Sequence, residues 1–164
     1  MEGLFLDSNS VKQGIAPQDG IGALAGARIS MSKATKCVFI VELGAGAGTN
    51  IVPSLDQHDA ASGGTSKALN IKANYYYKLA SSTAFTKVEV RPDDSGLSDS
   101  VDLSAEIAAN AATIVIEVLD SHLDVSNDFD HVSLNMEAAG GAKEVSSTII
   151  LRNLDKQAAY SEDV

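Results

Sequence analysis

The sequence predicts an all-β fold, an antiparallel β-sandwich of the jelly-roll or immunoglobulin-like kind, with an extended N-terminal arm. The first observation is about seven or eight short segments, rich in β-branched and aromatic residues and separated by turn-forming residues. The second is that no helical pattern of ten or more residues alternates with these segments, which disfavours a parallel α/β fold. The third is composition, since many small residues and few prolines are typical of short strands and turns.

The chain of 164 residues fits one domain with a sizeable core and leaves no room for separate cofactor and substrate domains. Its 12 Lys and Arg stand against 22 Asp and Glu, for a net charge of -10. That balance argues against nucleic acid or an anionic membrane as a partner, because both are themselves negatively charged. A partner with a basic surface is favoured.

The composition changes along the chain and predicts three regions. Residues 1–30 carry glycines and single apolar residues without a strand or helix period, so we expect an extended N-terminal arm there. A β-sandwich domain is expected at 31–153 and a polar C-terminal tail at 154–164. The first residues lack the basic and apolar stretches of a secretory signal, and no apolar segment approaches the roughly 20 residues that span a bilayer. Cys37 is the single cysteine, which excludes an intrachain disulfide and favours a reducing compartment.

The first four expected strands lie between residues 36 and 90. The segment KCVFIVEL is β-branched and aromatic, and TNIVPSLDQ alternates polar with apolar residues. In KALNIKANYYYKLA, the apolar Leu69, Ile71 and Ala73 fall on one face, whereas AFTKVEV alternates less cleanly. The four expected strands are therefore 36–43, 49–57, 67–80 and 84–90.

The second half of the chain begins with a loop and a short helical segment. RPDDSGLSDS at 91–100 is dense in turn formers, and SAEIAANAA at 104–112 favours one or two helical turns with Ser104 as candidate cap, or a strand edge. TIVIEVL at 113–119 is the clearest strand. Two further strands are expected at 131–137 and 144–154, and the Gly-Gly in the AAGGAK that joins them predicts a hairpin.

The segment CVFIVELGAGAGTN at 37–50 is close to the glycine loops that bind nucleotides or S-adenosylmethionine. Such a loop works because a helix begins directly after it and presents free N–H groups to an anion. Here β-branched Ile51 and Val52 and then Pro53 follow, which disfavours a helix, and Thr49 stands where the third glycine of the dinucleotide pattern belongs. We therefore expect a flexible hairpin connection between antiparallel strands and no cofactor.

Other candidate sites are weak. Asp124–Asp130 carries oxygen side chains at alternate positions like a calcium loop, but Phe129 replaces the turn glycine and Asn135 stands where the bidentate glutamate belongs. A turn rich in Asp and Asn, anchored by Phe129, is the favoured alternative to calcium. The histidines His58, His122 and His131 lack the spacing of a zinc pair. No G-x-S-x-G element supports a nucleophile, so we expect no enzyme activity.

Tyr75, Tyr76 and Tyr77 are consecutive in an expected strand, which places the first and third on one face and the second on the other. Tyrosines of this kind are common at a sandwich edge or a subunit contact, where one end of the ring is dry and the other wet. Stacking on a sugar is the alternative.

The order of segments resembles the tailed-phage capsid decoration, or cement, proteins. The similar phrases are VKQGIAPQD at 11–19, KATKCVFIVELGAGAGT at 33–49, TSKALNIKANYYYK at 65–78 and IVIEVLDSHLDVSNDFDHVSL at 114–134. The resemblance implies a jelly-roll or related sandwich that assembles as a homodimer or homotrimer on the outside of the head. It implies the major capsid protein as partner, a place on the capsid surface of the virion after synthesis in the host cytoplasm, and no catalytic residues.

A glycine-rich arm without a core period is suited to ordering on another protein's surface, and many copies in a shell would supply avidity. We therefore expect contacts with the capsid or between subunits. The expected contact residues are Leu4, Phe5, Val11, Ile15, Pro17, Tyr75, Tyr76 and Tyr77. The alternative function is a phage tail or receptor-binding module, a β-sandwich that binds carbohydrate.

Overall fold

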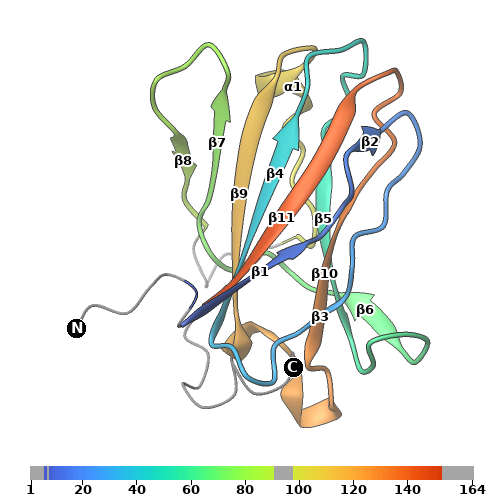
Figure 1. Ribbon diagram of the computed structural model, residues 1–164, viewed down its shortest axis with the longest axis vertical. Coiled ribbons are helices and arrows are strands. Elements are labelled where there is room, and N and C mark those ends of the chain that lie inside the picture. Colours follow the sequence, from blue (N-terminus) through green and yellow to red (C-terminus); the bar gives the residue numbers. More distant parts are fainter. Residues whose placement is uncertain (1–5, 7, 91–97, 153–164) are drawn as a thin grey trace.

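The computed structural model describes residues 6, 8–90 and 98–152 of the chain. Two antiparallel sheets pack against each other, which confirms the predicted all-β sandwich (Figure 1). The large sheet has the order β1 (Asn9–Gln13), β11 (Glu144–Arg152), β4 (Lys36–Leu43), β9 (Ala112–Leu119), β7 (Tyr75–Leu79) and β8 (Thr86–Val88), with β2 (Gln18–Asp19) also beside β11. The small sheet has the order β3 (Ile29–Ser30), β10 (His131–Met136), β5 (Pro53–His58) and β6 (Ser66–Ala68).

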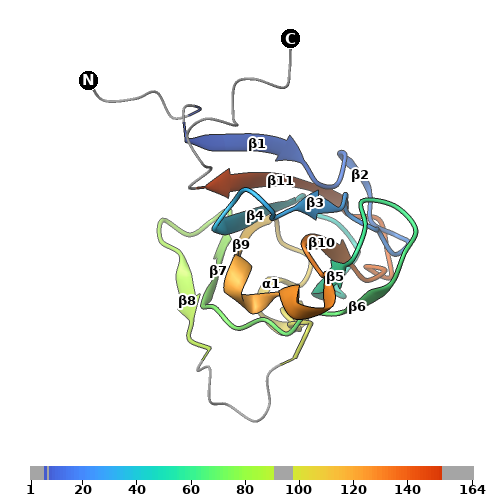
Figure 2. The same cartoon turned by 90° about the horizontal axis from the view of Figure 1, so that it is seen from below.

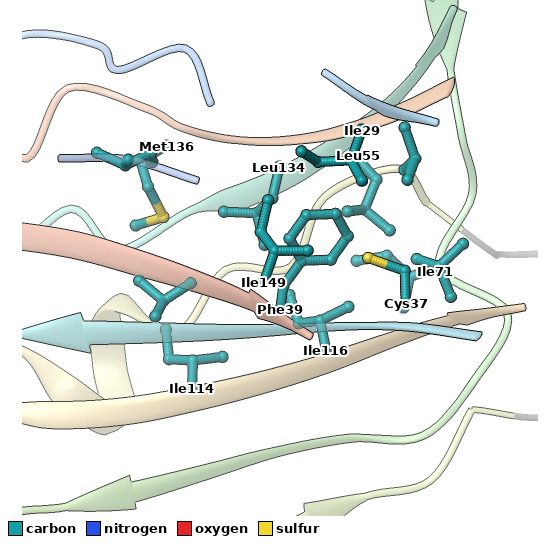
Figure 3. Packing of buried hydrophobic residues seen from close by; sticks show 14 of the residues in the cluster. Ile29, Cys37, Phe39, Leu55, Ile71, Ile114, Ile116, Leu134, Met136 and Ile149 are labelled. Carbon is teal, nitrogen blue, oxygen red and sulfur yellow. The ribbon is translucent and has the colours of Figure 1, made fainter. Parts of the chain in front are cut away.

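The core lies between the two sheets and is built by strand alternation. In β4, Cys37, Phe39 and Val41 are fully buried, and β9 and β11 contribute isoleucines to the same layer. Figure 3 shows Phe39 beside Ile149 of the large sheet and close to Leu134 of the small sheet. Cys37 is a core side chain, and burial raises the pKa of its thiol to about 12.

Two connections that were expected to be hairpins cross between the sheets instead. The Gly-Gly segment follows β10 of the small sheet and leads to β11 of the large sheet, and the segment after β4 of the large sheet leads to β5 of the small sheet. Strand β10 pairs with β5, and β11 pairs with β4, so neither predicted hairpin forms. The turn positions were predicted correctly and the pairing partners were wrong.

The two crossing connections pack backbone against backbone, and this accounts for their glycines. The N–H of Gly46 donates to the Ala109 carbonyl at 3.0 Å, and the N–H of Gly48 donates to the Ala142 carbonyl at 3.2 Å. A Cβ built at Gly46 would overlap the carbonyl oxygen of Ala142. These glycines are therefore required by a close approach of two chain segments, where hydrogen bonds hold them.

The segment expected as one strand at 67–80 contains two. Strand β6 ends at Ala68 in the small sheet, and β7 begins at Tyr75 in the large sheet. Leu69 and Ile71 lie between them and are 1% and 3% exposed, so the alternation that predicted a strand reflects burial at the crossing. Apolar alternation reports which side chains are buried and does not report whether the backbone is paired.

The expected N-terminal arm is extended, but its described part is bound into the sandwich. Strand β1 forms one edge of the large sheet beside β11, and β3 continues along β10 in the small sheet (Figures 1 and 2). Between them Ile15 is 2% exposed, and its N–H donates to Ser147 Oγ at 2.7 Å. The division of the chain at residue 30 therefore does not separate two structural units.

One helical turn, α1 (Ser104–Ile107), covers part of the core through the buried Ile107. Ser104 does not cap it through its side chain; its hydroxyl oxygen accepts the N–H of Ile51 at 2.9 Å instead. The Asp102 carboxylate accepts the N–H of Ser104, and hydrogen bonds with Ser104 lower the pKa of Asp102. No helix in the described part of the chain is long and apolar enough to cross a membrane.

Candidate functional site

A polar groove of about 470 Å³ runs along the outer face of the small sheet. Strand alternation turns Ser54 and Asp56 of β5, together with Asn135 of β10, away from the core and into its floor. One wall is the chain at 23–28, which reaches the sheet through the backbone bridge between Leu24 and Met136. The groove therefore combines three segments that are distant in the sequence.

The floor is organised around Asn135. Its amide Nδ2 donates to Asp56 Oδ2 at 2.8 Å, and its Oδ1 accepts the N–H of Gly26 at 3.1 Å. A Cβ at Gly26 would overlap the carbonyl oxygen of Leu134, so only glycine allows the wall to approach β10 this closely. Asn135 thus fixes the wall and the Asp56 carboxylate at the same time.

Arg28 closes one end of the groove. Its guanidinium donates to the carbonyls of Ala60 and Gly63 at 3.1 and 2.6 Å, and to Ser66 Oγ at 3.1 Å. This end is therefore positively charged, whereas Asp56 supplies negative charge on the floor. Hydroxyl, amide and carboxylate groups line the floor, whereas Ala23, Leu24 and Ala25 add apolar surface at the wall, so the groove offers both hydrogen-bonding and apolar contacts.

His58 lies beneath this end and is 4% exposed. Its Nδ1 is 2.7 Å from Ser66 Oγ and its Nε2 is 2.8 Å from Ser133 Oγ, so both ring nitrogens have a partner. Burial lowers the pKa of His58, and the positive charges of Arg28 and His131 add to the effect against the opposing influence of Asp56 and Asp59.

We expect the protein to lose stability as the pH falls below about 6.5, the usual histidine pKa. The unfolded chain takes up a proton at His58 near that pH, whereas the folded chain does so only at a lower pH, so acid favours unfolding over this window. Urea unfolding at pH 7.5 and 5.5 should show a smaller pH difference for His58→Gln than for the wild type. His122→Gln should also reduce the pH difference, because burial lowers the pKa of His122 in the same direction. An unchanged pH difference in His58→Gln would contradict the prediction.

The histidines are closer in space than their sequence spacing implies. His58 and His131 are directly opposite each other on β5 and β10, whereas His122 lies apart and accepts the N–H of Leu119 through Nδ1. His131 Nδ1 contacts the carboxylate of the adjacent Asp130. No group of three or more His, Cys, Asp or Glu side chains within the described residues is arranged to hold a metal ion.

In the Asp124–Asp130 loop, the carboxylate of Asp124 is engaged in contacts within the protein. Asp124 pairs with Lys67 and also accepts two hydrogen bonds from the side chain of Asn127, at 3.0 and 2.9 Å. Phe129 is 6% exposed, as expected for an anchor, and the Lys67 ammonium lies 4.1 Å from the centre of its ring. The hydrogen bonds from Lys67 and Asn127 lower the pKa of Asp124. They close the loop into a polar turn.

The expected contact residues of the N-terminal segment have different positions. Leu4 and Phe5 lie outside the described residues. Val11 is 49% exposed and Pro17 is exposed, whereas Ile15 is a core residue and offers no surface to a partner. The sequence alone does not separate these positions, because the exposure of Val11 and the burial of Ile15 both depend on how the segment lies against β11.

The three tyrosines are divided between the two faces of the large sheet, as alternation predicted. Tyr75 and Tyr77 lie opposite Ile116 and Ile114 and pack against the core, whereas Tyr76 is on the outer face. Burial raises the pKa of Tyr75, which is consistent with this position. The tyrosines therefore do not form a continuous aromatic surface on which a sugar could stack.

The sequence pattern does not predict that Lys143 is buried. Lys143 is 2% exposed, and its ammonium donates to the carbonyls of Ala108 and Asn110 at 3.0 and 2.9 Å. Burial lowers the pKa of Lys143. The ammonium therefore joins the residues that follow α1 to the crossing connection before β11, and its role is structural. A lysine beside Gly-Gly carries no sequence signal of burial.

No protein-family model matches the chain, and no curated protein matches it. Among solved structures, the chain is similar to the crystal structure of the SPBc2 prophage-derived protein YomS. The TM-score is 0.42 and the sequence identity 10%, over 87% of this chain and 92% of that one. A similarity of this size carries no argument about function.

Proposed function

We propose that the protein is a noncatalytic structural component of a phage virion that binds the outer surface of the capsid and stabilises the head. The observation that carries this proposal is the display of apolar side chains by the N-terminal segment. Leu6 and Ile21 are 54% and 61% exposed, and their apolar side chains are available for burial against a partner protein. The phrases that resemble capsid decoration proteins support the same function.

The N-terminal segment is suited to this contact because its backbone is already ordered. It pairs with β11 through β1 and with β10 through β3, so little conformational entropy is lost when its side chains are covered. The partner is proposed to be the major capsid protein. Repetition over a shell multiplies a weak single contact into firm attachment.

The test is binding of the purified protein to expanded capsids that lack it. Ile21→Ser and Leu6→Ser should each weaken binding by roughly tenfold, as expected when about 1.5 kcal/mol of apolar burial is lost. Phe85→Ser is the matched control, because Phe85 is also 48% exposed but lies outside the N-terminal segment. Absence of binding by the wild type, or equal binding by all variants, would count against the function.

The polar groove favours a second candidate, a tail or receptor-binding module that recognises a carbohydrate. Its Asp56 and Asn135 pair offers a carboxylate next to an amide, a combination that hydrogen-bonds sugar hydroxyls. Among the described residues, the lining includes no Phe, Tyr or Trp on which a sugar could stack, and this makes the candidate the weaker one. A bacterial surface polysaccharide that raises the Tm of the wild type but not of Asp56→Ala would support it over the capsid function.

A further inference from the structure

We propose that the protein associates with a second copy of itself through the outer face of the large sheet. The register places two adjacent rows of apolar side chains across the middle of this face. We call these residues the aliphatic patch: Val11, Ile150 and Val38 in one row, and Ile40, Val115 and Tyr76 in the next. The outward positions of a solvated sheet are normally polar, so the central strands have the composition of strands covered on both faces.

The described elements cover only the inner face of the large sheet. The small sheet and α1 both lie on that inner side (Figure 2). On the outer side Val11 is 49% exposed, and Ile40, Val115, Ile150 and Tyr76 are each partly exposed. Val38 is 8% exposed, since the Lys36–Glu117 ion pair of 2.7 Å passes beside it. The patch therefore continues across the sheet, and its members other than Val38 are accessible at least in part.

Charged residues surround the patch and are nearly balanced in sign. The basic residues on this face are Lys36, Lys78, Lys87 and Arg152, and the acidic ones are Asp19, Glu42, Glu89, Glu117 and Glu144. The whole chain carries a net charge of -10, so two copies repel each other least where this face meets its equivalent. An apolar centre with a charged rim is also the usual composition of a protein interface.

The charges of β4 favour a second copy over an unrelated partner. Lys36 stands at one end of this strand and Glu42 at the other, and both point outward. Consider a two-fold axis that lies in the plane between the large sheets of the two copies, perpendicular to β4 and level with its middle. This axis would set Lys36 of each copy against Glu42 of the other. The face is thus complementary to itself, as a two-fold interface requires.

The size of the face sets the strength expected of this contact. Five strands about 4.8 Å apart and about seven residues long give a surface of roughly 20 by 20 Å. Specific interfaces commonly bury on the order of 800 Å² per partner, so this contact has about half the standard size and belongs with the weak, transient interfaces. We therefore expect a dimer that forms reversibly with increasing protein concentration.

Sedimentation from about 1 µM to about 1 mM protein tests the proposal. The wild type should shift from the 17.0 kDa chain mass towards twice that mass. Ile150→Lys should raise the dimer Kd by roughly a hundredfold, because a two-fold interface contains each substitution twice. Val125→Lys is the control, since Val125 is 60% exposed but lies outside the large sheet, and it should dimerise like the wild type.

Charge reversal tests the two-fold arrangement itself. Lys36→Glu and Glu42→Lys should each weaken the dimer, whereas the double variant should dimerise more strongly than either, because the opposite charges face each other again. A wild type that stays monomeric throughout, or a dimer that Ile150→Lys leaves intact, would overturn the proposal. This result is independent of the capsid function, whose variants at Leu6 and Ile21 lie outside the patch.

Discussion

Gly46→Ala is expected to lower the free energy of unfolding by about 1–3 kcal/mol. The new Cβ would overlap the Ala142 carbonyl oxygen and lie 3.1 Å from the Cα of Lys143, and backbone atoms cannot rotate aside as a side chain can. The two crossing connections would have to separate, which would strain the hydrogen bond from Gly46 to Ala109. Urea unfolding of the purified variant measures the loss.

Gly22→Ala provides the matched control. An added Cβ at Gly22 meets nothing within 4 Å, and the residue is exposed with a backbone conformation open to any L residue. We expect its free energy of unfolding to stay within about 0.5 kcal/mol of the wild type. Equal stability of the two variants would contradict the packing of the crossing connections described above.

Lys143→Met is expected to destabilise the protein by about 1–3 kcal/mol. Methionine fills a similar volume, but it leaves the carbonyls of Ala108 and Asn110 without the donor that now binds them at 3.0 and 2.9 Å. Burial of the ammonium is itself unfavourable, as the lowered pKa of Lys143 indicates. Its removal therefore offsets part of the loss. Urea unfolding measures the net effect.

A second measurement separates this explanation from a general loss of packing. The amide of Ile107 bonds to the Leu103 carbonyl within α1, so its hydrogen exchange should speed up more in Lys143→Met than that of residues in β4. Lys12→Met is the control, because Lys12 is exposed on β1 and its replacement should change neither quantity. Exchange that is accelerated uniformly would show that Lys143 does not act through α1.

The strands that the sequence predicted best are those in which local pattern and burial agree. The segments 36–43 and 113–119 are continuous runs of β-branched and apolar residues, and they became β4 and β9. Strand β10 likewise follows the alternation of Val132, Leu134 and Met136. These residues favour extended backbone wherever they are placed, so the prediction needed no knowledge of neighbours.

The candidate sites depended more on contacts between distant segments. The groove unites Gly26, Asp56 and Asn135, which are adjacent only because β10 lies between β5 and the chain before β3. The aliphatic patch could be anticipated in part, since Val38, Ile40 and Val115 occupy outward positions of strands that read as apolar throughout. Its continuation to Ile150 and Val11 required the order of strands in the large sheet.

The sequence alone determined the all-β class, the central strands and the absence of a helix after the glycine run at 44–48. Alternation and β-branched residues act over a few neighbouring positions, and these properties follow from such local preferences. Only the tertiary structure decided that the glycine connections cross between sheets, that Ile15 and Lys143 are buried, and that the N-terminal segment forms an edge of the sandwich. The choice of strand partner depends on burying both inner faces at once, and that free energy belongs to the assembled sheets and not to any single segment.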